Sequence, residues 1–303
     1  MNIIIFQTLT KDDKNLLDRY YRSGYYENSH FNFTNLFMWR KPYKVKHAEQ
    51  GEILYLTCEW EGVLYALQPV CASSRWEEAV ATLRAYFAEQ GTALYFTGIE
   101  KNFADFLAER YPGAFDIQSD RDNFDYVYLA DKLITLAGRK LHSKKNHLNA
   151  FRKLYPEAEY MKITPAILPA CKAELEKWYA AHIEAMPDSK FIPWERDAIL
   201  ELFEDWDYFQ LKGGAICLHG RIIAFTFGEQ LNRDSVVVHV EKADPNIRGA
   251  YPAINQGFIE HEWSGMTYIN REEDMGQEGL RKAKESYKPE KMIEKYNARY
   301  IAD

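Results

Sequence analysis

Residues 235–261, SVVVHVEKADPNIRGAYPAINQGFIEH, predict a strand, a turn and a helix in succession. The run from Ser235 to Ala243 is rich in β-branched residues, which is typical of a strand. Pro252 stands near the first position of a helix, where its missing N–H is tolerated. The turn between them contains Gly249. Such a turn either leaves backbone N–H groups free to bind a phosphate or another anion, or is a plain connection eased by glycine.

Strand and helix patterns alternate along the whole chain and fall into two halves. A chain of 303 residues is long for one ordinary core. We therefore expect an α/β (α+β) protein with two domains, residues 1–130 and 131–303. Runs typical of strands stand at 3–6, 52–70, 93–99 and 124–130 in the first half, and at 158–164, 215–231, 235–243, 266–270 and 292–301 in the second.

Composition excludes several broad classes of protein. A formal net charge of -7 with 27% charged residues gives no global preference for nucleic acid or an anionic membrane. The apolar runs fall short of the roughly 20 residues that cross a bilayer, and the amino terminus has no secretory pattern. We expect a cytoplasmic chain without a transmembrane segment. The four cysteines show no CxxC spacing, and His142 and His147 are poorly spaced for one helix face, so no metal site is expected.

One segment departs from the acidic average of the chain. Residues 132–156, KLITLAGRKLHSKKNHLNAFRKLYP, hold seven Lys and Arg and no Asp or Glu. Their spacing predicts a basic amphipathic helix over 139–154, with apolar residues on one face. It is either a solvated helix or a surface that contacts phosphates of RNA or of a nucleotide-bearing donor. The candidate contacts are Lys144, Lys145, Asn146 and His147.

A second segment combines acidic, glycine and basic residues. Residues 268–292, YINREEDMGQEGLRKAKESYKPEKM, predict a helix that Asp274 caps. Gly276 and Gly279 would each cost about 0.8–1 kcal/mol inside a helix, which suggests close approach of a ligand or of other backbone. Arg281 and Lys284 share a helix face and are the favoured anion-binding residues. Further candidates for substrate binding in this segment are Asn270, Arg271 and Tyr287.

The two motifs RKLHSKKNHLNAFRKLYP (139–156) and NREEDMGQEGLRKAKESYKP (270–289) together resemble a bacterial family of unknown function. That family is grouped with the C-terminal domain of phosphatidylglycerol lysyltransferase. The resemblance covers most of the chain and implies two tandem GNAT-like domains of the acyl-CoA N-acyltransferase type, with mixed, mostly antiparallel sheets flanked by helices. Fem-type aminoacyl transferases share this arrangement. The lysyltransferases move an aminoacyl group from aminoacyl-tRNA to a lipid hydroxyl, and Fem-type enzymes deliver it to an amine.

The resemblance therefore implies an acyl or aminoacyl transferase. Aminoacyl-tRNA or another nucleotide-bearing molecule is the expected donor, and a small molecule, lipid or peptide is the acceptor. Glu241 stands where GNAT-like enzymes often keep a base, and Glu272 and Asp274 are alternative bases. Arg248 is a further donor-site candidate. An acetyl-CoA-dependent N-acetyltransferase and a binding module without catalysis are the alternatives.

A GNAT-like fold implies acyl-CoA as a possible cofactor. The family's pyrophosphate loop has a pattern like Q/R-x-x-G-x-G/A, and this chain reads Asn246-Ile247-Arg248-Gly249-Ala250-Tyr251. The bulky Tyr251 replaces a small residue where the backbone has to approach the diphosphate, which argues against acyl-CoA.

Overall fold

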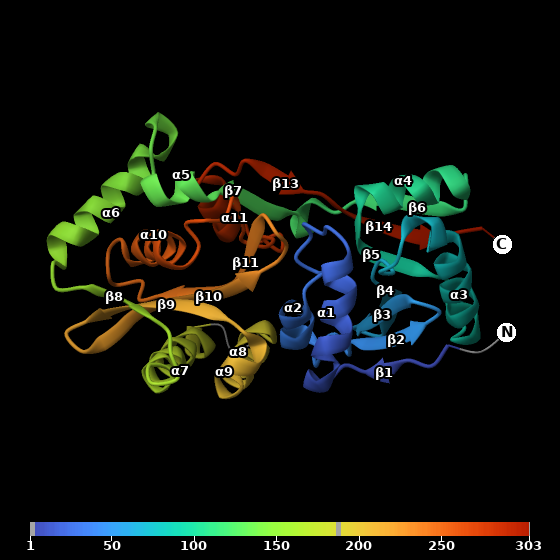
Figure 1. The fold of residues 1–303 in the computed structure, drawn as a ribbon, viewed down its shortest axis with the longest axis horizontal. Helices are drawn as coiled ribbons and strands as arrows, with labels where there is room; N and C mark the ends of the chain where they lie inside the picture. The colour runs from blue at the N-terminus through green and yellow to red at the C-terminus, as the bar shows by residue number, and fades with distance from the viewer. Residues whose placement is uncertain (1–3, 186–188, 303) are drawn as a thin grey trace. The chain divides into compact units, whose positions relative to one another are not determined.

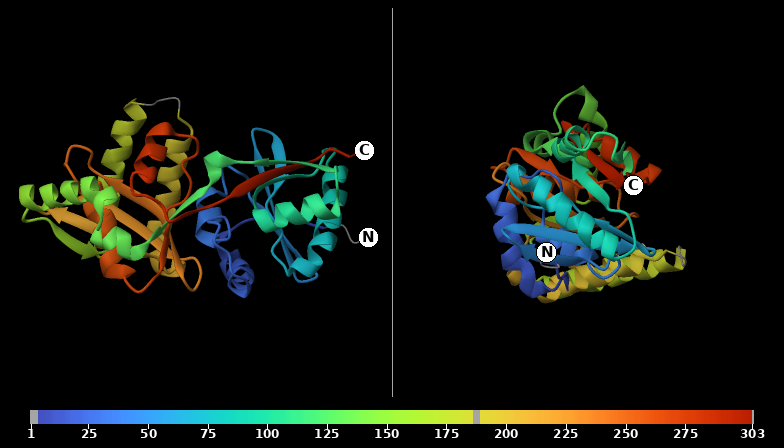
Figure 2. Two further views of the ribbon diagram at one scale, coloured as in Figure 1. Left: turned by 90° about the horizontal axis from the view of Figure 1, so that it is seen from above. Right: turned by 90° about the vertical axis from the view of Figure 1, so that its right-hand side faces the viewer.

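The computed structural model describes residues 4–185 and 189–302 (Figure 1; Figure 2). The chain forms two compact units. The first contains the chain up to Phe124 and again from Ile293, and the second is Asp125–Met292. None of the helices in the described residues is long and apolar enough to cross a membrane.

The first unit is built on a seven-stranded sheet in the order β1-β2-β3-β4-β5-β14-β6. Neighbouring strands run antiparallel, except β4 and β5, which are parallel. Aromatic and aliphatic residues of the sheet and of α3 and α4 fill the core. The elements are β1 (Gln7–Thr8), α1 (Lys14–Ser23), α2 (Phe33–Trp39), β2 (Lys46–Gln50), β3 (Ile53–Trp60), β4 (Val63–Ala66), α3 (Trp76–Glu89), β5 (Tyr95–Glu100), α4 (Lys101–Arg110), β6 (Phe115–Ser119) and β14 (Lys295–Tyr300).

The second unit has a sheet in the order β13-β7-β12-β11-β10-β9-β8. Helices α5, α6 and α10 lie on one face, and α7, α8 and α9 on the other (Figure 1). The elements are β7 (Asp125–Leu129), α5 (Ala130–Thr135), α6 (His142–Leu154), β8 (Glu159–Lys162), α7 (Leu168–Ala185), α8 (Phe191–Glu204), α9 (Trp206–Phe209), β9 (Lys212–Leu218), β10 (Arg221–Gln230), β11 (Ser235–Ala243), α10 (Ala250–Glu262), β12 (Tyr268–Asn270), α11 (Glu278–Glu285) and β13 (Lys291–Ile293).

Two strands lie in a different sheet from the one that their place in the sequence suggests. The strand predicted at 124–130 was expected to complete the first domain, but β7 pairs with β12 in the second sheet. The last strand, β14, lies between β5 and β6 in the first. The division by contacts therefore falls at 124/125, not at the expected 130/131, and the carboxyl-terminal residues from Ile293 belong to the first unit. The physical reason is burial, since Tyr126 and Tyr128 complete the core of the second unit and Ala298 that of the first.

A β-bulge in β11 sets which side chains face α10. Phe227 pairs with Val240 and Gly228 with Val238, so His239 has no partner of its own in β10. Gly228 permits the close approach, because a Cβ there would lie 2.1 Å from the carbonyl oxygen of Val237. The extra residue shifts the in–out alternation, as bulges do. Val236 and Val238 face the core under α10, but beyond the bulge Glu241 faces that side.

The turn before α10 is shaped by its contact with α6. Gly249 has φ +85° and is the residue that precedes α10. A Cβ at this position would lie 2.6 Å from the carbonyl oxygen of His147 and 2.9 Å from Cβ of Phe151, both on α6. Gly249 therefore serves the packing of the basic helix against the turn.

We expect Gly249→Ala to destabilise the second unit more than Gly220→Ala. Gly220 also has positive φ, 76°, but the described residues leave open space around its Cβ position. Gly220→Ala should cost about 1 kcal/mol for the left-handed backbone alone. Gly249→Ala adds a clash with backbone and should cost about 2 kcal/mol more. Urea unfolding of both variants measures the difference, and equal costs would show that α6 does not constrain the turn.

Candidate functional site

The site lies where β11 and β12 stop pairing. Their parallel ladder covers only Ser235–Val237 against Tyr268–Asn270. After Asn270 the chain turns away through residues 271–277, in which Glu272 and Met275 have positive φ of 56° and 52°. Such conformations are costly for residues other than glycine and persist only where their surroundings enforce them. The side chains of this loop and of the carboxyl half of β11 meet beside α10.

Glu241 and Arg271 form an ion pair at the centre of this region. Nη2 of Arg271 lies 3.0 Å from Oε1 of Glu241, and each side chain is 12% exposed. Nδ2 of Asn255, on α10, donates to Oε2 of Glu241 over 2.9 Å. The guanidinium lies 5.7 Å from the ring centre of Tyr128 and 5.0 Å from that of Tyr287. We call these five residues the Glu241 cluster.

Two polar atoms of the cluster lack a partner among the described residues. Nη1 of Arg271 and Oδ1 of Asn255 are both buried and make no hydrogen bond there. Burial lowers the pKa of Arg271, but the Glu241 carboxylate and the two tyrosines outweigh it and hold the pKa above its ordinary value. A buried donor and acceptor left open cost free energy unless another molecule satisfies them. The cluster thus presents one charged donor and one neutral acceptor beside a carboxylate.

Lys144 of α6 borders the Glu241 cluster. Its ammonium lies 4.3 Å from the ring centre of Tyr287. Burial and the positive charge of Arg271 lower its pKa, which Glu241 partly offsets. The basic helix therefore contributes one half-buried cation to the site, while Lys145, Asn146 and His147 of the same helix are exposed.

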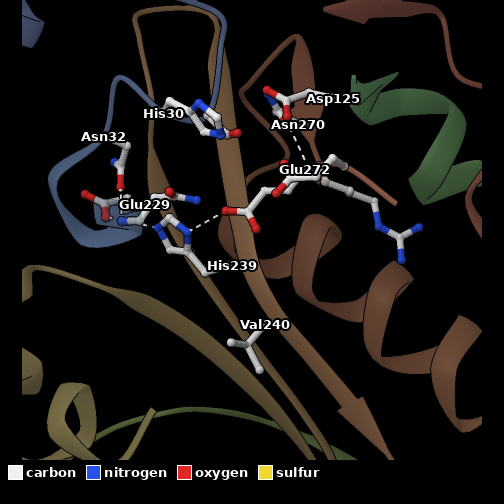
Figure 3. Close-up of polar contacts among 12 residues, drawn as sticks. His30, Asn32, Asp125, Glu229, His239, Val240, Asn270 and Glu272 are labelled. Carbon is white, nitrogen blue, oxygen red and sulfur yellow. Dashed lines mark hydrogen bonds and ion pairs between the residues drawn. The ribbon is translucent and has the colours of Figure 1, made fainter. Parts of the chain in front are cut away.

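A second polar group lies at the bulge (Figure 3). The ring of His239 lies between two carboxylates, with Nδ1 3.0 Å from Oε1 of Glu272 and Nε2 3.2 Å from Oε1 of Glu229. The His239 side chain is only 1% exposed. Burial lowers its pKa, but the two carboxylates overcome this and raise the pKa to about 9. His239 is therefore an imidazolium at neutral pH, and it fixes the side chain of Glu272.

The loop 271–277 is held by its own polar contacts. Asp274 is fully buried, and its carboxylate accepts from Arg281 over 2.8 and 2.9 Å, from the Tyr126 hydroxyl over 2.5 Å and from the backbone of Gly276 over 2.9 Å. Burial raises the pKa of Asp274, but these hydrogen bonds outweigh it and lower the pKa to about 2. The carboxylate therefore organises the loop and is a poor proton acceptor at neutral pH.

Lys284 holds the same loop through the backbone. Its ammonium donates to the carbonyls of Arg271, Glu272 at 3.0 Å and Glu273 at 2.6 Å. Burial is the main cause that lowers the pKa of Lys284 to about 8. Asn270 adds to the support, because its side chain accepts from the N–H of Glu272 and donates to Asp125 over 2.9 Å (Figure 3). These contacts hold the backbone of the loop so that Arg271 can pair with Glu241.

Comparisons with known proteins show which family the chain belongs to. Residues 23–299 match the family model described as phosphatidylglycerol lysyltransferase, C-terminal. The chain belongs to this family. A conserved protein of unknown function from Bacteroides thetaiotaomicron has 33% identity and a TM-score of 0.91, over 98% of this chain and 100% of that one. The C-terminal domain of a putative lysylphosphatidylglycerol synthetase from Agrobacterium fabrum has the same fold, with a TM-score of 0.68 at 13% identity over 97% and 93% of the two chains.

Two further matches define how far the likeness extends. A tandem GNAT protein from the clavulanic acid biosynthesis pathway matches with a TM-score of 0.52 at 9% identity, over 99% of both chains. The expected family and the tandem GNAT-like fold are thus confirmed. An uncharacterised protein of Mycoplasmoides gallisepticum is 30% identical over 180 residues, 58% of this chain, and the match spans 56% of that relative.

Several residues expected to bind substrate have other tasks in this member of the lysyltransferase family. Lys284 donates to three backbone carbonyls of the chain itself, and Arg281 is paired with Asp274. These two residues, which we expected to bind an anion, support the loop. Gly276 has a positive φ of 72°, which explains the glycine. Gly279 has open space around its Cβ position, so no close approach explains it. Asp274 does not cap α11, which begins after Gln277.

The turn before α10 packs closely against α6. The side of Gly249 is filled by that helix, and Arg248 is exposed. Burial raises the pKa of the Tyr251 hydroxyl, and a hydrogen bond with the backbone of Ala243, at the end of β11, partly offsets this. The sequence argument against acyl-CoA stays a prediction. Among the described residues, no three of the His, Cys, Asp and Glu side chains are grouped to hold a metal ion.

A pocket of about 220 Å³ lies on the opposite face of the sheet, between α7, β10 and the end of β11. Lys242 extends into it, over the ring of Trp178 and 2.8 Å from Glu195. Arg221 at its rim is paired with Glu174 and Asp244. Lys242 and Arg221 are thus paired, whereas the Glu241 cluster keeps a buried donor and a buried acceptor without a partner among the described residues. That cluster is therefore the better candidate site.

Four residues of the site were not expected from the sequence: His239, Glu229, Asn255 and Tyr128. A charged residue inside the run SVVVHV is a detectable signal, since a lone histidine in a buried strand needs partners. Asn255 stands on the buried face of α10, which is also unusual for an amide. The hydrogen-bond partners of His239 and Asn255 lie in other elements of the fold, so the local spacing of the sequence does not predict them.

We expect the stability of the protein to fall with rising pH through His239. The pKa of His239 is raised from 6.5 to about 9 in the folded state. The contribution of charged His239 to the free energy of unfolding is fully present below pH 6.5 and is lost as the pH rises through about 9. The linkage between protonation and folding makes this contribution on the order of 3 kcal/mol. The stability gap between wild type and His239→Gln, from urea unfolding, should narrow over this range, and a constant gap would contradict a charged His239. Comparing the two proteins removes the opposite contribution of Lys284.

We expect Lys284→Met to destabilise the protein by about 3 kcal/mol, because three buried carbonyls lose a charged donor. The matched control is Lys282→Met on the same helix, where the side chain is 73% exposed and paired with Glu278. That change should cost less than about 0.5 kcal/mol. Urea unfolding compares the two, and similar costs would show that Lys284 does not hold the loop.

Proposed function

We propose that this protein transfers an aminoacyl group from aminoacyl-tRNA to an amine or hydroxyl of an acceptor molecule, and that the Glu241 cluster is where transfer occurs. Membership in the lysyltransferase family supports an acyl or aminoacyl transferase. The observation that carries the proposal is the oriented Glu241 carboxylate, held by Arg271 and Asn255 beside two buried polar atoms that have no partner among the described residues.

The reaction needs positioning and a proton acceptor more than covalent help. The acceptor nitrogen or oxygen attacks the ester carbonyl carbon, and Glu241 takes its proton. The bond to the ribose oxygen then breaks, and the proton returns to that oxygen. Arg271 supplies a fixed positive charge for the oxyanion that develops on the carbonyl, and preorganised charge of this kind lowers the barrier. Oδ1 of Asn255 accepts a hydrogen bond from the acceptor N–H or O–H.

The other expected site residues have supporting parts in this proposal. Glu272 is the partner of imidazolium His239, which makes it a weaker candidate for the base than Glu241. Tyr287 forms an aromatic wall under Arg271. The exposed cations of the basic helix supply an electrostatic surface for the phosphates of the donor RNA. They include Arg139, Lys140, Lys145 and Lys153.

The proposal is tested by following a labelled aminoacyl group from a mixture of aminoacyl-tRNAs into acceptor fractions of a bacterial extract. Glu241→Gln keeps the size of the side chain and should lower the rate by about 100-fold or more, as loss of a general base does. Glu260→Gln, at an exposed position of α10, is the matched control and should leave the rate unchanged.

Three results would count against the proposal. Equal rates for Glu241→Gln and wild type would remove Glu241 from the reaction. Absence of transfer, together with retained binding of RNA, would favour a binding module without catalysis. Transfer from acetyl-CoA would contradict the prediction, made from Tyr251, that acyl-CoA is not the donor.

A further inference from the structure

The charge balance around the Glu241 cluster is unequal. Three cations lie in or beside it: Arg271, Lys144 and Lys284, and Lys284 is satisfied by three backbone carbonyls. Glu241 is the carboxylate whose charge acts on both Arg271 and Lys144. Both oxygens of that carboxylate already accept hydrogen bonds, from Arg271 and Asn255. Lys144 has no hydrogen bond or ion pair among the described residues, and its ammonium lies over the ring of Tyr287.

An uncompensated ammonium in this position is unfavourable. Lys144 is half-buried, and it experiences the repulsion of Arg271. A cation that is partly removed from water is normally paired, because the lost hydration must be replaced. On the same helix Lys145 is exposed and keeps its hydration, so the two neighbouring lysines differ in surroundings although they share a chemistry.

We propose that Lys144 binds an oxyanion, a phosphate or carboxylate group, that belongs to one of the molecules using the Glu241 cluster. The inference rests on the proposed function for its context, and it names a property of the substrate that the function alone leaves open. The ammonium donates to an oxygen of this group, while Arg271 contributes a second positive charge without leaving Glu241. A charge-assisted contact of this kind is stronger than a neutral one.

An oxyanion site at Lys144 determines which substrate groups fit beside the Glu241 cluster. A substrate group that carries a positive charge, such as a lysyl side chain, would meet Lys144 and Arg271 together and be repelled. The site therefore selects an anionic group at this position and disfavours a lysyl group there, whatever the name of the family suggests. Lys144 is a residue that sets specificity, and the proton transfer at Glu241 does not require it.

Binding of simple probes to the full chain tests the inference directly. Inorganic phosphate, acetate and lysine amide are titrated by calorimetry at constant ionic strength. We expect phosphate or acetate to bind, and the two dissociation constants show which oxyanion is preferred. Lysine amide should not bind. Lys144→Gln should weaken binding of the preferred anion about tenfold, the loss expected for one charge-assisted hydrogen bond.

Two further variants make the result specific. Lys144→Arg keeps the charge and should retain most of the affinity. Lys172→Gln removes an exposed lysine of α7, on the other face of the sheet, and should change the dissociation constant less than about twofold, as for a screened surface charge. The inference is overturned if neither anion binds, if Lys144→Gln and Lys172→Gln weaken binding equally, or if lysine amide is the probe that binds. Circular dichroism confirms that each variant is folded.

The outcomes separate this inference from the proposed function. Anion binding that depends on Lys144, in a protein that transfers no aminoacyl group, would keep the oxyanion site and reject the transfer. Transfer by a protein that binds neither phosphate nor acetate would do the reverse. If both hold, Lys144→Gln should raise KM for the anionic substrate far more than it lowers kcat.

Discussion

The bulge at His239 is the constraint on which the site depends. Without the extra residue, the alternation of β11 would turn Glu241 away from α10 and bring Lys242 under it. With it, Glu241 reaches Asn255 and Arg271, and Lys242 lies on the opposite face with Trp178 and Glu195. The bulge itself rests on Gly228, where any side chain would collide with the backbone of Val237. A single backbone irregularity thus chooses which of two neighbouring charged residues enters the site.

The loop 271–277 shows how a strained segment is stabilised by buried charge. Burying Asp274, Lys284 and His239 is costly in each case, and each is compensated by several hydrogen bonds within the second unit. The charged residues that looked most like ligand contacts in the sequence are the ones that this compensation uses. Three polar groups make no hydrogen bond among the described residues: Nη1 of Arg271, Oδ1 of Asn255 and the ammonium of Lys144. These groups therefore say more about a ligand than the paired charges do.

Family and fold do not by themselves assign a substrate to this chain. The matches to lysylphosphatidylglycerol synthetase domains lie at low identity and show the fold, and the family model shows kinship. The activity has to come from the site. Its carboxylate, guanidinium and amide suit acyl transfer, and the surplus of positive charge beside them suits an anionic substrate group. The turn before α10 packs against α6 at Gly249, and the sequence argument against acyl-CoA stays a prediction.

The class of fold, the family and the basic helix could be predicted from the sequence, because periodicity and motif residues are local signals. The sequence also named Glu241, Arg271, Lys144 and Tyr287, which the structure brings together, and their role in a site stays a proposal. The folded structure placed β7 and β14 in the sheets opposite to their places in the chain, because strand pairing is set by burial between distant segments. It also decided that Arg281 and Lys284 support the loop and that His239 is held between Glu229 and Glu272. Those roles depend on the partners of each buried charge, and the spacing of residues along the sequence does not predict these partners.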